Sequence, residues 1–178
     1  MTGPLLTTDR LILSPVAPAD FDDLKTVWSN EDFTRHIMGR ALTSEEIWFR
    51  LLRDLGHWQV RGHGNWSVRR REDEAYVGSV GVLDYHRDIE PPLVDPELGW
   101  GVAPAFQGQG LALEAVAAVL AWADQSLAAA RTVCMIGPDN LASLKLAAKA
   151  GYRPFERAEY KASPVILLER PRGGPPPA

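Results

Sequence analysis

Apolar side chains in the first third of the chain follow first a strand-like and then a helical spacing. Residues 10 to 14 form a short apolar run, which predicts a strand. Apolar residues at helical spacing follow Pro18 and predict one helix that ends at Asn30. A second amphipathic helix is predicted to begin at the capping box of residues 43 to 46, Thr-Ser-Glu-Glu, and to close near Gly62.

The rest of the chain alternates strands with helices. Two strand-like runs flank the acidic turn at residues 72 to 74 and predict an antiparallel hairpin. A long helix is predicted after the glycines at 108 and 110, and a later one ends at Gly151. In chain order, the predicted elements of this part are strands 65–70, 76–83 and 97–102, a helix 110–127, a strand 132–136, a helix 140–151, and strands 152–157 and 165–169.

This order of elements predicts a mixed α/β sheet within a single domain of residues 1–170. The chain has 178 residues, of which 46% are hydrophobic. A chain of that length buries about two-thirds of its unfolded surface in one core. Residues 171–178 are rich in proline and glycine and are predicted to form a disordered tail.

Charge and composition narrow the classes of function. The net charge of −4 and the pI near 5.6 argue against nucleic acid as a partner and fit an amine or another cationic substrate better. The N-terminus has no signal-peptide pattern, and no uncharged apolar run approaches the roughly 20 residues that span a bilayer. With a single cysteine, Cys134, these features predict a soluble cytoplasmic protein that does not contact a membrane. His57, His63 and His86 lack the paired spacing of a zinc site, so no metal is predicted.

The loop from Gln107 to Ala112 lies between a predicted strand and the start of a predicted helix. Free backbone N–H groups and the positive end of the helix dipole converge at such a place, which therefore binds anions. Gly108 and Gly110 allow a sharp turn and a close approach of the backbone to a phosphate, and residues 107 to 112 contain no Asp or Glu. An ordinary glycine turn before a helix is the plain alternative.

Two common nucleotide-binding motifs fit this loop poorly. A P-loop needs a lysine followed by Ser or Thr after its second glycine, but Leu111 and Ala112 follow Gly110. A Rossmann motif needs a small residue at position 113, which is leucine, and an acid in the next strand, which residues 133 to 136 do not supply. The loop therefore favours a different phosphate-containing ligand.

Residues 97 to 112 and 140 to 152 together resemble the GNAT superfamily of N-acetyltransferases. The acetyl-CoA loop of that family, Gln/Arg-x-x-Gly-x-Gly/Ala, is matched by Gln107, Gly110 and Ala112. Further short motifs, spread over nearly the whole chain, look like the branch that contains the ribosomal-protein N-terminal acetyltransferases. They are Thr8-Asp9-Arg10-Leu11, Glu97-Leu98-Gly99-Trp100, Ala112-Leu113-Glu114-Ala115 and Asn140-x-x-Ser143.

The resemblance implies both a fold and a reaction. The fold would be a GNAT-like α/β, mostly antiparallel sheet of about seven strands with about four helices. Its strands 97–102 and 132–136 would splay apart in a V. The reaction would transfer an acetyl group from acetyl-CoA to a primary amine by direct attack in a ternary complex. The residues implied in binding acetyl-CoA are Trp100, Gly101, Val102, Gln107, Gly108, Gln109, Gly110, Leu111, Ala112, Asn140 and Ser143.

The resemblance also implies roles in proton transfer. Glu97 is the candidate base, because a carboxylate is expected at the mouth of the splayed strands; an exposed strand-end acid is the alternative. The tyrosine that often protonates the departing thiolate in the family is replaced here by Ala147. Ser143 is the acid that the branch implies, and Asn140 would bind the pantetheine arm, although positions in a helix cap explain both residues as well. Cys134 has no sequence partner that would make it a nucleophile.

The identity of the acceptor stays open in the sequence. A protein N-terminus, a polyamine and an aminoglycoside are all compatible with it, as is a catalytically silent CoA-binding sensor. Exposed edge strands would allow a homodimer. An acidic stretch could attract a cationic acceptor or simply be solvated; it comprises Asp84, Asp88, Glu90, Asp95 and Glu97. Aromatic residues that could line an acceptor pocket or belong to the core are Trp58, Trp66, Tyr85 and Trp100.

Overall fold

The computed structural model describes residues 3–174 and contains an eight-stranded sheet. The strands lie in the order β1-β2-β3-β4-β5-β6-β8-β7, and every neighbouring pair is antiparallel except β5 and β6. The predicted mixed, mostly antiparallel sheet is confirmed, and the short β1 is the strand that was not expected. In chain order the strands are β1 (Leu6–Thr7), β2 (Leu11–Pro15), β3 (Asn65–Arg70), β4 (Tyr76–Leu83), β5 (Glu97–Val102), β6 (Arg131–Ile136), β7 (Arg153–Tyr160) and β8 (Ser163–Pro171).

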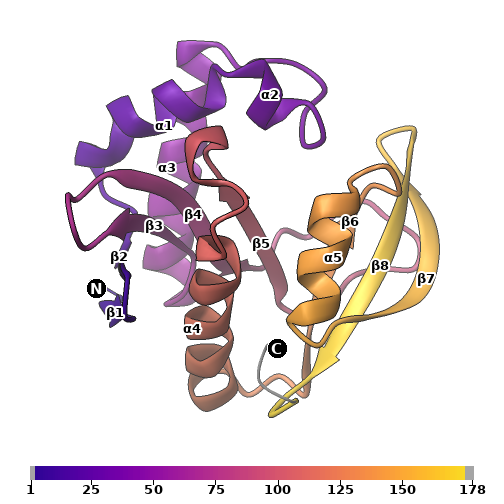
Figure 1. Cartoon of the computed structure of the whole chain (residues 1–178). Helices are drawn as coiled ribbons and strands as arrows, with labels where there is room; N and C mark the ends of the chain where they lie inside the picture. Colours follow the sequence, from indigo (N-terminus) through magenta and orange to yellow (C-terminus); the bar gives the residue numbers. More distant parts are fainter. Residues whose placement is uncertain (1–2, 175–178) are drawn as a thin grey trace.

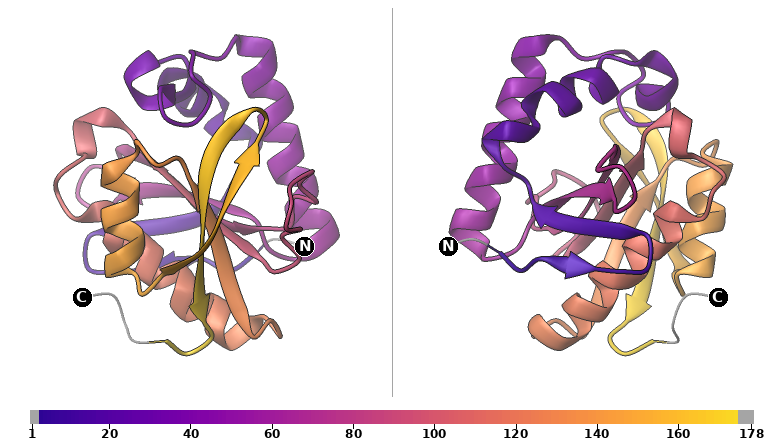
Figure 2. Two further views of the ribbon diagram at one scale, coloured as in Figure 1. Left: turned by 90° about the vertical axis from the view of Figure 1, so that its right-hand side faces the viewer. Right: turned by 60° about the vertical axis from the view of Figure 1, so that its left-hand side comes forward.

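Helices cover both faces of this sheet. In Figure 1, α3 lies behind β3 and β4 whereas α4 lies in front of the sheet, and the turned views of Figure 2 keep the sheet between these two helices. The α-helices are α1 (Phe21–Trp28), α2 (Glu31–Thr34), α3 (Ser44–Arg61), α4 (Leu111–Ser126) and α5 (Leu141–Lys149), and the 3-10 helices are η1 (Pro18–Asp20) and η2 (Pro104–Phe106).

The first predicted helix is shorter than expected, and α2 is an additional helix. α1 ends at Trp28, and the side-chain oxygen of Asn30 accepts hydrogen bonds from the N–H groups of Asp32 at 2.9 Å and Phe33 at 3.3 Å. Asn30 therefore begins α2 rather than ending α1. Asparagine is common both at helix N-caps and just after helix ends, so the sequence pattern alone did not separate the two cases.

The second predicted helix, α3, has the expected boundaries. The N–H of Glu46 donates to Thr43 Oγ1 at 3.3 Å, and the N–H of Thr43 donates to Glu46 Oε2 at 2.9 Å. At the other end, Gly62 has a φ of 71°, the left-handed conformation that closes many helices. Both terminal motifs of α3 are thus confirmed.

β7 and β8 form a hairpin that is longer than the two predicted strands. β7 is an outer strand with mostly exposed residues, so its sequence lacks the alternation of a half-buried strand. Pro171, predicted to open a disordered tail, is the last residue of β8 and pairs with Arg131. The N–H of Arg172 donates to Ala130 O at 2.9 Å, so the predicted start of a disordered tail at residue 171 is wrong. Residues 175–178 lie outside the described residues.

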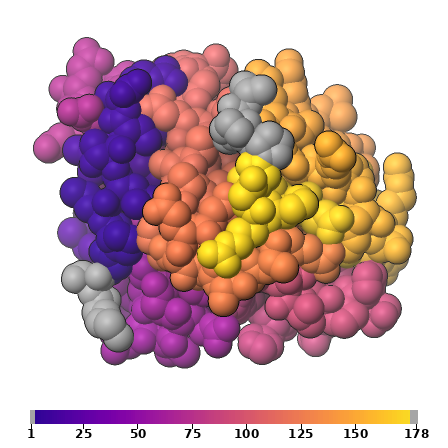
Figure 3. All heavy atoms as spheres, turned by 90° about the horizontal axis from the view of Figure 1, so that it is seen from below, coloured from indigo at the N-terminus to yellow at the C-terminus, as the bar shows by residue number. Residues whose placement is uncertain are grey.

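The end of β8 is held against α4. Arg170 forms two hydrogen bonds of 2.9 Å with the carboxylate of Asp124, and Arg172 Nε donates to Asp124 O at 2.8 Å. Seen from below, the N-terminal strands (indigo), α4 (orange) and the end of β8 (yellow) lie side by side (Figure 3). These contacts join the C-terminal hairpin to the rest of the molecule.

The faces of β4 and β5 differ in character. Val80, Val82 and Leu98 share one face, are almost fully buried and belong to the main hydrophobic core, which also contains the inner residues of α4. This face stabilises the fold through apolar burial.

The other face of β4 and β5 carries small residues. On this face Ser79 pairs with Gly101 and Gly81 pairs with Gly99. α1, α2 and α3 lie over this face, and a Cβ atom placed at Gly101 would lie 2.7 Å from the ring of Phe33. Among the described residues that are not its chain neighbours, a Cβ atom at Gly99 would instead meet one side chain within 4 Å, Leu83 Cδ1 at 3.9 Å. Space is therefore left above the middle of β5.

Candidate active site

The loop from Gln107 to Ala112 has the geometry of an anion-binding helix start. Gly108 and Gly110 have φ values of 74° and 77°, and Gly110 is the N-cap of the sixteen-residue α4. In the part of the chain that the structure describes, the N–H groups of residues 108 to 113 donate to no backbone carbonyl. Residues 108 to 110 are exposed, and the unpaired amides together with the positive end of the helix dipole attract a negatively charged group.

Arg10 and Glu114 lie directly beside this loop. Arg10 Nε donates to Glu114 Oε2 at 2.7 Å and Arg10 Nη1 donates to Gln109 O at 3.0 Å, while Thr8 Oγ1 donates to Glu114 Oε1 at 2.5 Å. Burial acts to raise the pKa of Glu114, but the hydrogen bonds from Thr8 and Arg10 lower it below its ordinary value. The motifs Thr8-Asp9-Arg10-Leu11 and Ala112-Leu113-Glu114-Ala115 thus meet beside the loop. Arg10 neutralises the negative charge that Glu114 would otherwise bring to the helix start.

β5 and β6 are paired at only one position. Glu97 pairs with Val133, next to a 2.9 Å hydrogen bond from Val133 N–H to Pro96 O, whereas β4 and β5 pair along their whole length. Since Ala103 N–H donates to Val77 O at 2.8 Å, strand alternation directs the N–H groups of Trp100 and Val102 away from β4 and toward β6. The two strands separate beyond their junction, as Figure 1 shows, which agrees with the predicted V.

The open end of β5 is connected to the glycine loop. Gln107 Nε2 donates to Val102 O at 3.1 Å, and Gln109 Nε2 donates to Ala105 O at 3.0 Å. The side chains of Gln107 and Gln109 therefore shape the loop, and the free backbone amides of β5 and of the loop lie on one connected segment of chain.

Glu97, the candidate base, is buried and held in an ion pair. Arg87 Nη2 donates to Oε1 at 2.7 Å and Arg87 Nε donates to Oε2 at 2.5 Å, while Arg87 Nη1 donates to the hydroxyl of Tyr160 at 3.1 Å. Burial acts to lower the pKa of Arg87, but the hydrogen bond and the charge of Glu97 raise it above its ordinary value. Glu97 also lies where β5 and β6 meet, and not at the open end of the splay where it was expected.

The acidic stretch does not form a free negative surface. Arg61 Nε donates to Asp84 Oδ2 at 2.7 Å, Arg131 Nε donates to Asp95 Oδ2 at 2.7 Å, and Glu97 is paired with Arg87. A small cavity of about 180 Å³ adjoins these pairs. Since arginine neutralises three of the five acids, the stretch gives little support for attraction of a cationic acceptor.

The two further residues implied by the resemblance, Asn140 and Ser143, lie at the start of α5, beyond the second strand of the splay. Asn140 Oδ1 accepts a hydrogen bond from the N–H of Ser143 at 3.1 Å, so Asn140 is the N-cap of α5 and its side-chain NH₂ group stays available. Ser143 is half-buried in the first turn. Ala147, one turn further along, is completely buried in the core and offers no acidic group. Burial raises the pKa of the Cys134 thiol well above its ordinary value, which makes that residue a poor nucleophile.

Two of the four candidate aromatic residues belong to the core. Trp58 and Trp66 are almost fully buried and meet edge to face, with ring centroids 4.7 Å apart. Tyr85 and Trp100 are half-buried. Only this second pair can line a surface that a substrate reaches.

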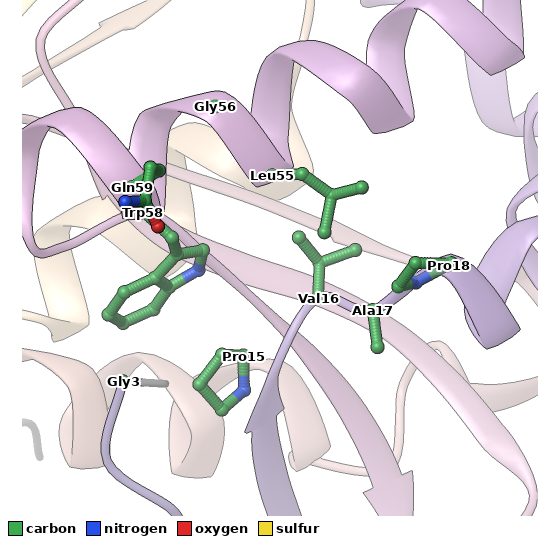
Figure 4. A pocket seen from close by; sticks show the side chains of 9 residues that line it. All are labelled: Gly3, Pro15, Val16, Ala17, Pro18, Leu55, Gly56, Trp58 and Gln59. Atoms are coloured by element: carbon green, nitrogen blue, oxygen red, sulfur yellow. The ribbon is translucent and has the colours of Figure 1, made fainter. Parts of the chain in front are cut away.

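Another cavity lies away from these residues, between α3 and the end of β2. It measures about 560 Å³, and Figure 4 shows the residues around it, which come from α3 and from two segments near the N-terminus. Of the described residues, its lining includes none with an ionisable side chain and none of the predicted site residues; the lining residues are Gly3, Pro15, Val16, Ala17, Pro18, Leu55, Gly56, Trp58 and Gln59. It therefore lacks the groups that acid–base chemistry needs.

Residues 3–174 contain neither a cluster of metal ligands nor a membrane-spanning helix. No group of three or more His, Cys, Asp or Glu side chains in that range is placed to hold a metal ion. None of the helices there combines the length and the apolar character that crossing a membrane requires.

Comparison with known proteins was made for the whole chain. The sequence model of the acetyltransferase (GNAT) domain matches residues 10–153. An uncharacterised N-acetyltransferase of Bacillus subtilis (strain 168), YoaA, is 25% identical over 154 residues, which cover 84% of this chain and 83% of that protein.

Solved structures of similar fold were found as well. A Bordetella pertussis protein named for the GnaT acetyltransferase family is 34% identical, with a TM-score of 0.83 over 94% of this chain and 99% of that one. A ribosomal L7/L12 alpha-N-protein acetyltransferase in complex with coenzyme A is 16% identical, with a TM-score of 0.77 over 94% of this chain and 98% of that one, a similarity of fold alone.

Proposed function

Because the chain belongs to the acetyltransferase (GNAT) family, we propose that it transfers the acetyl group of acetyl-CoA to a primary amine. The amine nitrogen attacks the thioester carbonyl, the C–S bond breaks, the coenzyme A thiolate leaves and the amine loses a proton. The observation that carries this proposal is the row of free amides at residues 108 to 113, which lies beside the open end of β5.

The residues of the loop fit the diphosphate of coenzyme A. The amides of Gly108 and Gly110 can approach phosphate oxygens without an intervening side chain, and Arg10 adds a positive charge at the same loop. The proposed contacts of the loop involve Gln107, Gly108, Gln109, Gly110, Leu111 and Ala112. Acetyl-CoA supplies the thioester, and the protein supplies the anion site that holds it.

The free edge of β5 would hold the other end of the same substrate. The N–H groups of Trp100 and Val102 face the space between β5 and β6, where they can pair with the amides of the pantetheine arm and stabilise the negative charge that develops on the thioester oxygen. On the α1 to α3 face, Gly101 allows the ring of Phe33 to pack closely against β5, and the free NH₂ group of Asn140 is available at the start of α5.

Glu97 and Ser143 are the proposed groups for proton transfer. Glu97 would accept the amine proton, directly or through water, and the proton would have to compete with Arg87 for the carboxylate. The hydroxyl of Ser143 would protonate the leaving thiolate, since Ala147 has no group to do so.

Buried Ala147 also favours a second candidate, a protein that binds coenzyme A without turnover. Thiol release separates the two functions. We expect free thiol to appear when the protein is mixed with acetyl-CoA and a panel of peptides, amino acids, polyamines and aminoglycosides, in proportion to the amine consumed. Tight binding of coenzyme A with no amine-dependent thiol from any acceptor would leave only the binding function.

A further inference from the structure

Arg50, on α3, is a charged side chain without a role in the reaction described above. It is half-buried, and its Cζ atom lies 3.6 Å from the centroid of the Trp28 ring. Burial lowers the pKa of Arg50 to about 10, and the neighbouring charge of Arg53 acts in the same direction. The guanidinium remains charged at neutral pH, in a setting that disfavours charge.

Arg50 differs from every other buried or half-buried arginine that the structure describes. Each of the others forms an ion pair with at least one carboxylate. For Arg50, no carboxylate of the described chain lies within ion-pair distance and no described atom accepts a hydrogen bond from it; the charge of Asp54, which Arg53 and Asn65 already bind, acts on Arg50 without a hydrogen bond. The arginines that do have a carboxylate partner are Arg69, Arg70, Arg87, Arg131 and Arg170.

Stacking on Trp28 leaves the edge of the guanidinium free. A cation is attracted to the electron-rich face of an indole ring, so the stacking explains why the side chain adopts this position. The stacking involves only one face of the guanidinium. The five N–H donors of arginine lie in the guanidinium plane and point outward, so stacking leaves them without a hydrogen-bond partner. Among the described side chains, Arg170 Nε is the only nitrogen or oxygen that is fully enclosed without a partner, so the nitrogens of Arg50 still reach solvent. A planar anion could occupy that edge.

Arg50 lies over the face of β5 that carries the small residues. The rings of Trp28 and Phe33 meet edge to face at 5.0 Å, and Phe33 is the side chain that a Cβ atom at Gly101 would strike. A continuous set of contacts therefore leads from Gly101 through Phe33 and Trp28 to Arg50.

The opposite side of this region is bounded by Tyr85. The ring of Tyr85 lies 5.0 Å from Arg53 Cζ and 4.6 Å from Arg87 Cζ, and Arg87 holds Glu97. Burial raises the pKa of Tyr85, and the charges of both Arg50 and Glu97 act on its hydroxyl. Contacts of Tyr85 thus connect Arg53 on α3 with the ion pair of Arg87 and Glu97, and Glu97 lies on the same face of β5 as Gly99.

We propose that Arg50 binds a carboxylate of the acceptor, so that the enzyme acetylates amines that also carry a carboxylate. This inference rests on the proposed acetyl transfer and names its class of acceptor. The carboxylate would bind in the plane of the guanidinium, above Gly99, with the amine directed toward the splay. A polyamine or an aminoglycoside would instead bring further positive charge to an unpaired cation. Two sources share this chemistry, a free amino acid and a peptide that begins with an acidic residue.

Paired acceptors that differ only in the carboxylate test the proposal. The first pair is lysine and its decarboxylated analogue cadaverine, and the second is a C-terminally amidated peptide that begins with Asp and the same peptide beginning with Asn. For one pair or both, we expect kcat/KM to be about 10-fold higher for the carboxylate member, because a charged hydrogen bond contributes more than 1.4 kcal/mol. Whichever pair shows the preference identifies the source of the carboxylate.

Substitutions at Arg50 test whether this side chain causes the preference for the carboxylate member. Arg50→Met keeps a side chain of similar length over Trp28 and should abolish the preference by raising KM for the carboxylate member only, with KM for acetyl-CoA unchanged. Arg50→Lys keeps the charge without the planar fork and should retain part of the preference. The control is Arg35→Met, since Arg35 is exposed and paired with Asp32. The Arg35→Met variant should retain the full carboxylate preference.

Calorimetric binding of the same acceptors to the coenzyme A complex makes the test independent of turnover. If no acceptor releases thiol, the proposed function fails, yet tighter binding of the carboxylate members that Arg50→Met abolishes would still support the inference. Equal binding and equal turnover of both members of each pair, or a carboxylate preference that survives in Arg50→Met, would overturn it.

Discussion

Gly110 combines a left-handed backbone, with φ of 77°, and a place at the N-terminus of α4. A valine there is strained, and its side chain blocks the approach of a phosphate to the amides. We expect Gly110→Val to raise KM for acetyl-CoA by about 10-fold, the loss of one or two hydrogen bonds, with KM for the amine unchanged. Steady-state kinetics with each substrate varied in turn measure both constants.

Gly62→Val is the matched control for this change. Gly62 has a φ of 71° and closes α3, and a Cβ atom there would meet nothing within 4 Å among the described residues. The two variants should lose similar stability, but only Gly110→Val should impair the use of acetyl-CoA. An unchanged KM for acetyl-CoA in Gly110→Val would show that the diphosphate binds elsewhere.

Glu97→Gln separates a catalytic from a structural carboxylate. If Glu97 accepts the amine proton, kcat falls by about 10²- to 10⁴-fold, and the rise of kcat with pH that deprotonation of a base produces disappears. The variant also leaves Arg87 without its carboxylate, so we expect the free energy of unfolding to fall by about 1–3 kcal/mol. Thermal unfolding and the pH profile of kcat measure the two effects separately.

Asp95→Asn provides the comparison for Glu97→Gln. Asp95 belongs to the same segment and pairs with Arg131, which keeps Glu169 as a second partner. The Asp95→Asn variant should retain the wild-type kcat. A Glu97→Gln variant that is destabilised but turns over at the wild-type rate would make Glu97 a purely structural partner of Arg87.

The contact between the start of β2 and the start of α4 supports the anion site. Arg10→Gln removes the cation beside Gln109 and leaves the charge of Glu114 unneutralised at the helix N-terminus. Since a charge there changes the free energy of anion binding by about 0.3–1 kcal/mol, KM for acetyl-CoA should rise about 2- to 5-fold. Initial-rate kinetics test this, with Arg71→Gln as the control, because in the described chain the side chain of Arg71 donates only to the carbonyls of Thr8 and Asp9. Equal KM values in the two variants would contradict the proposal.

Most elements were predictable because their local pattern and their tertiary setting agree. The capping box of α3 and the bounds of β5, residues 97 to 102, are the same in the prediction and in the structure. β7 was predicted too short because an exposed outer strand shows no alternation, and α2 was missed because one asparagine fits either end of a helix. Local signals determine these elements only where burial imposes a pattern.

The glycine loop was predictable because it is continuous in the sequence, whereas the pairing of side chains was not. Arg87 and Glu97 are separated by an irregular connection, and Arg50 reaches the same face of β5 from α3. Such neighbours depend on tertiary packing, so no spacing rule identifies them. For the same reason the sequence suggested a free acidic stretch where the structure has ion pairs.

The stability of the whole molecule should depend on pH through His57. Its Nδ1 lies 2.6 Å from His63 O and its Nε2 accepts the N–H of Asp84 at 2.9 Å, an arrangement that requires the neutral ring. Burial lowers the pKa of His57 below its ordinary value of 6.5. The unfolded chain therefore binds a proton before the folded one, so the contribution of His57 is complete above pH 6.5 and is lost as pH falls through the lower folded value.

Thermal unfolding between pH 7.5 and pH 5 tests this dependence. Each kcal/mol lost should lower Tm by about 2–4 °C for a chain of this size. His57→Gln should have a lower Tm at pH 7.5 and a flatter dependence on pH, whereas exposed His36→Gln should follow the wild type. Parallel curves for all three proteins would assign the pH dependence to the carboxylates.

The single junction between β5 and β6 has a consequence for amide hydrogen exchange. The N–H groups of Leu98, Trp100 and Val102 all point toward β6, but only Leu98 lies next to the pair of Glu97 with Val133. In the free protein, Trp100 and Val102 should therefore exchange with deuterium much faster than Gly99 and Gly101, whose N–H groups face β4. If the pantetheine arm pairs with this edge, coenzyme A should slow exchange at Trp100 and Val102 selectively, and the site would then be a sheet that a ligand strand completes.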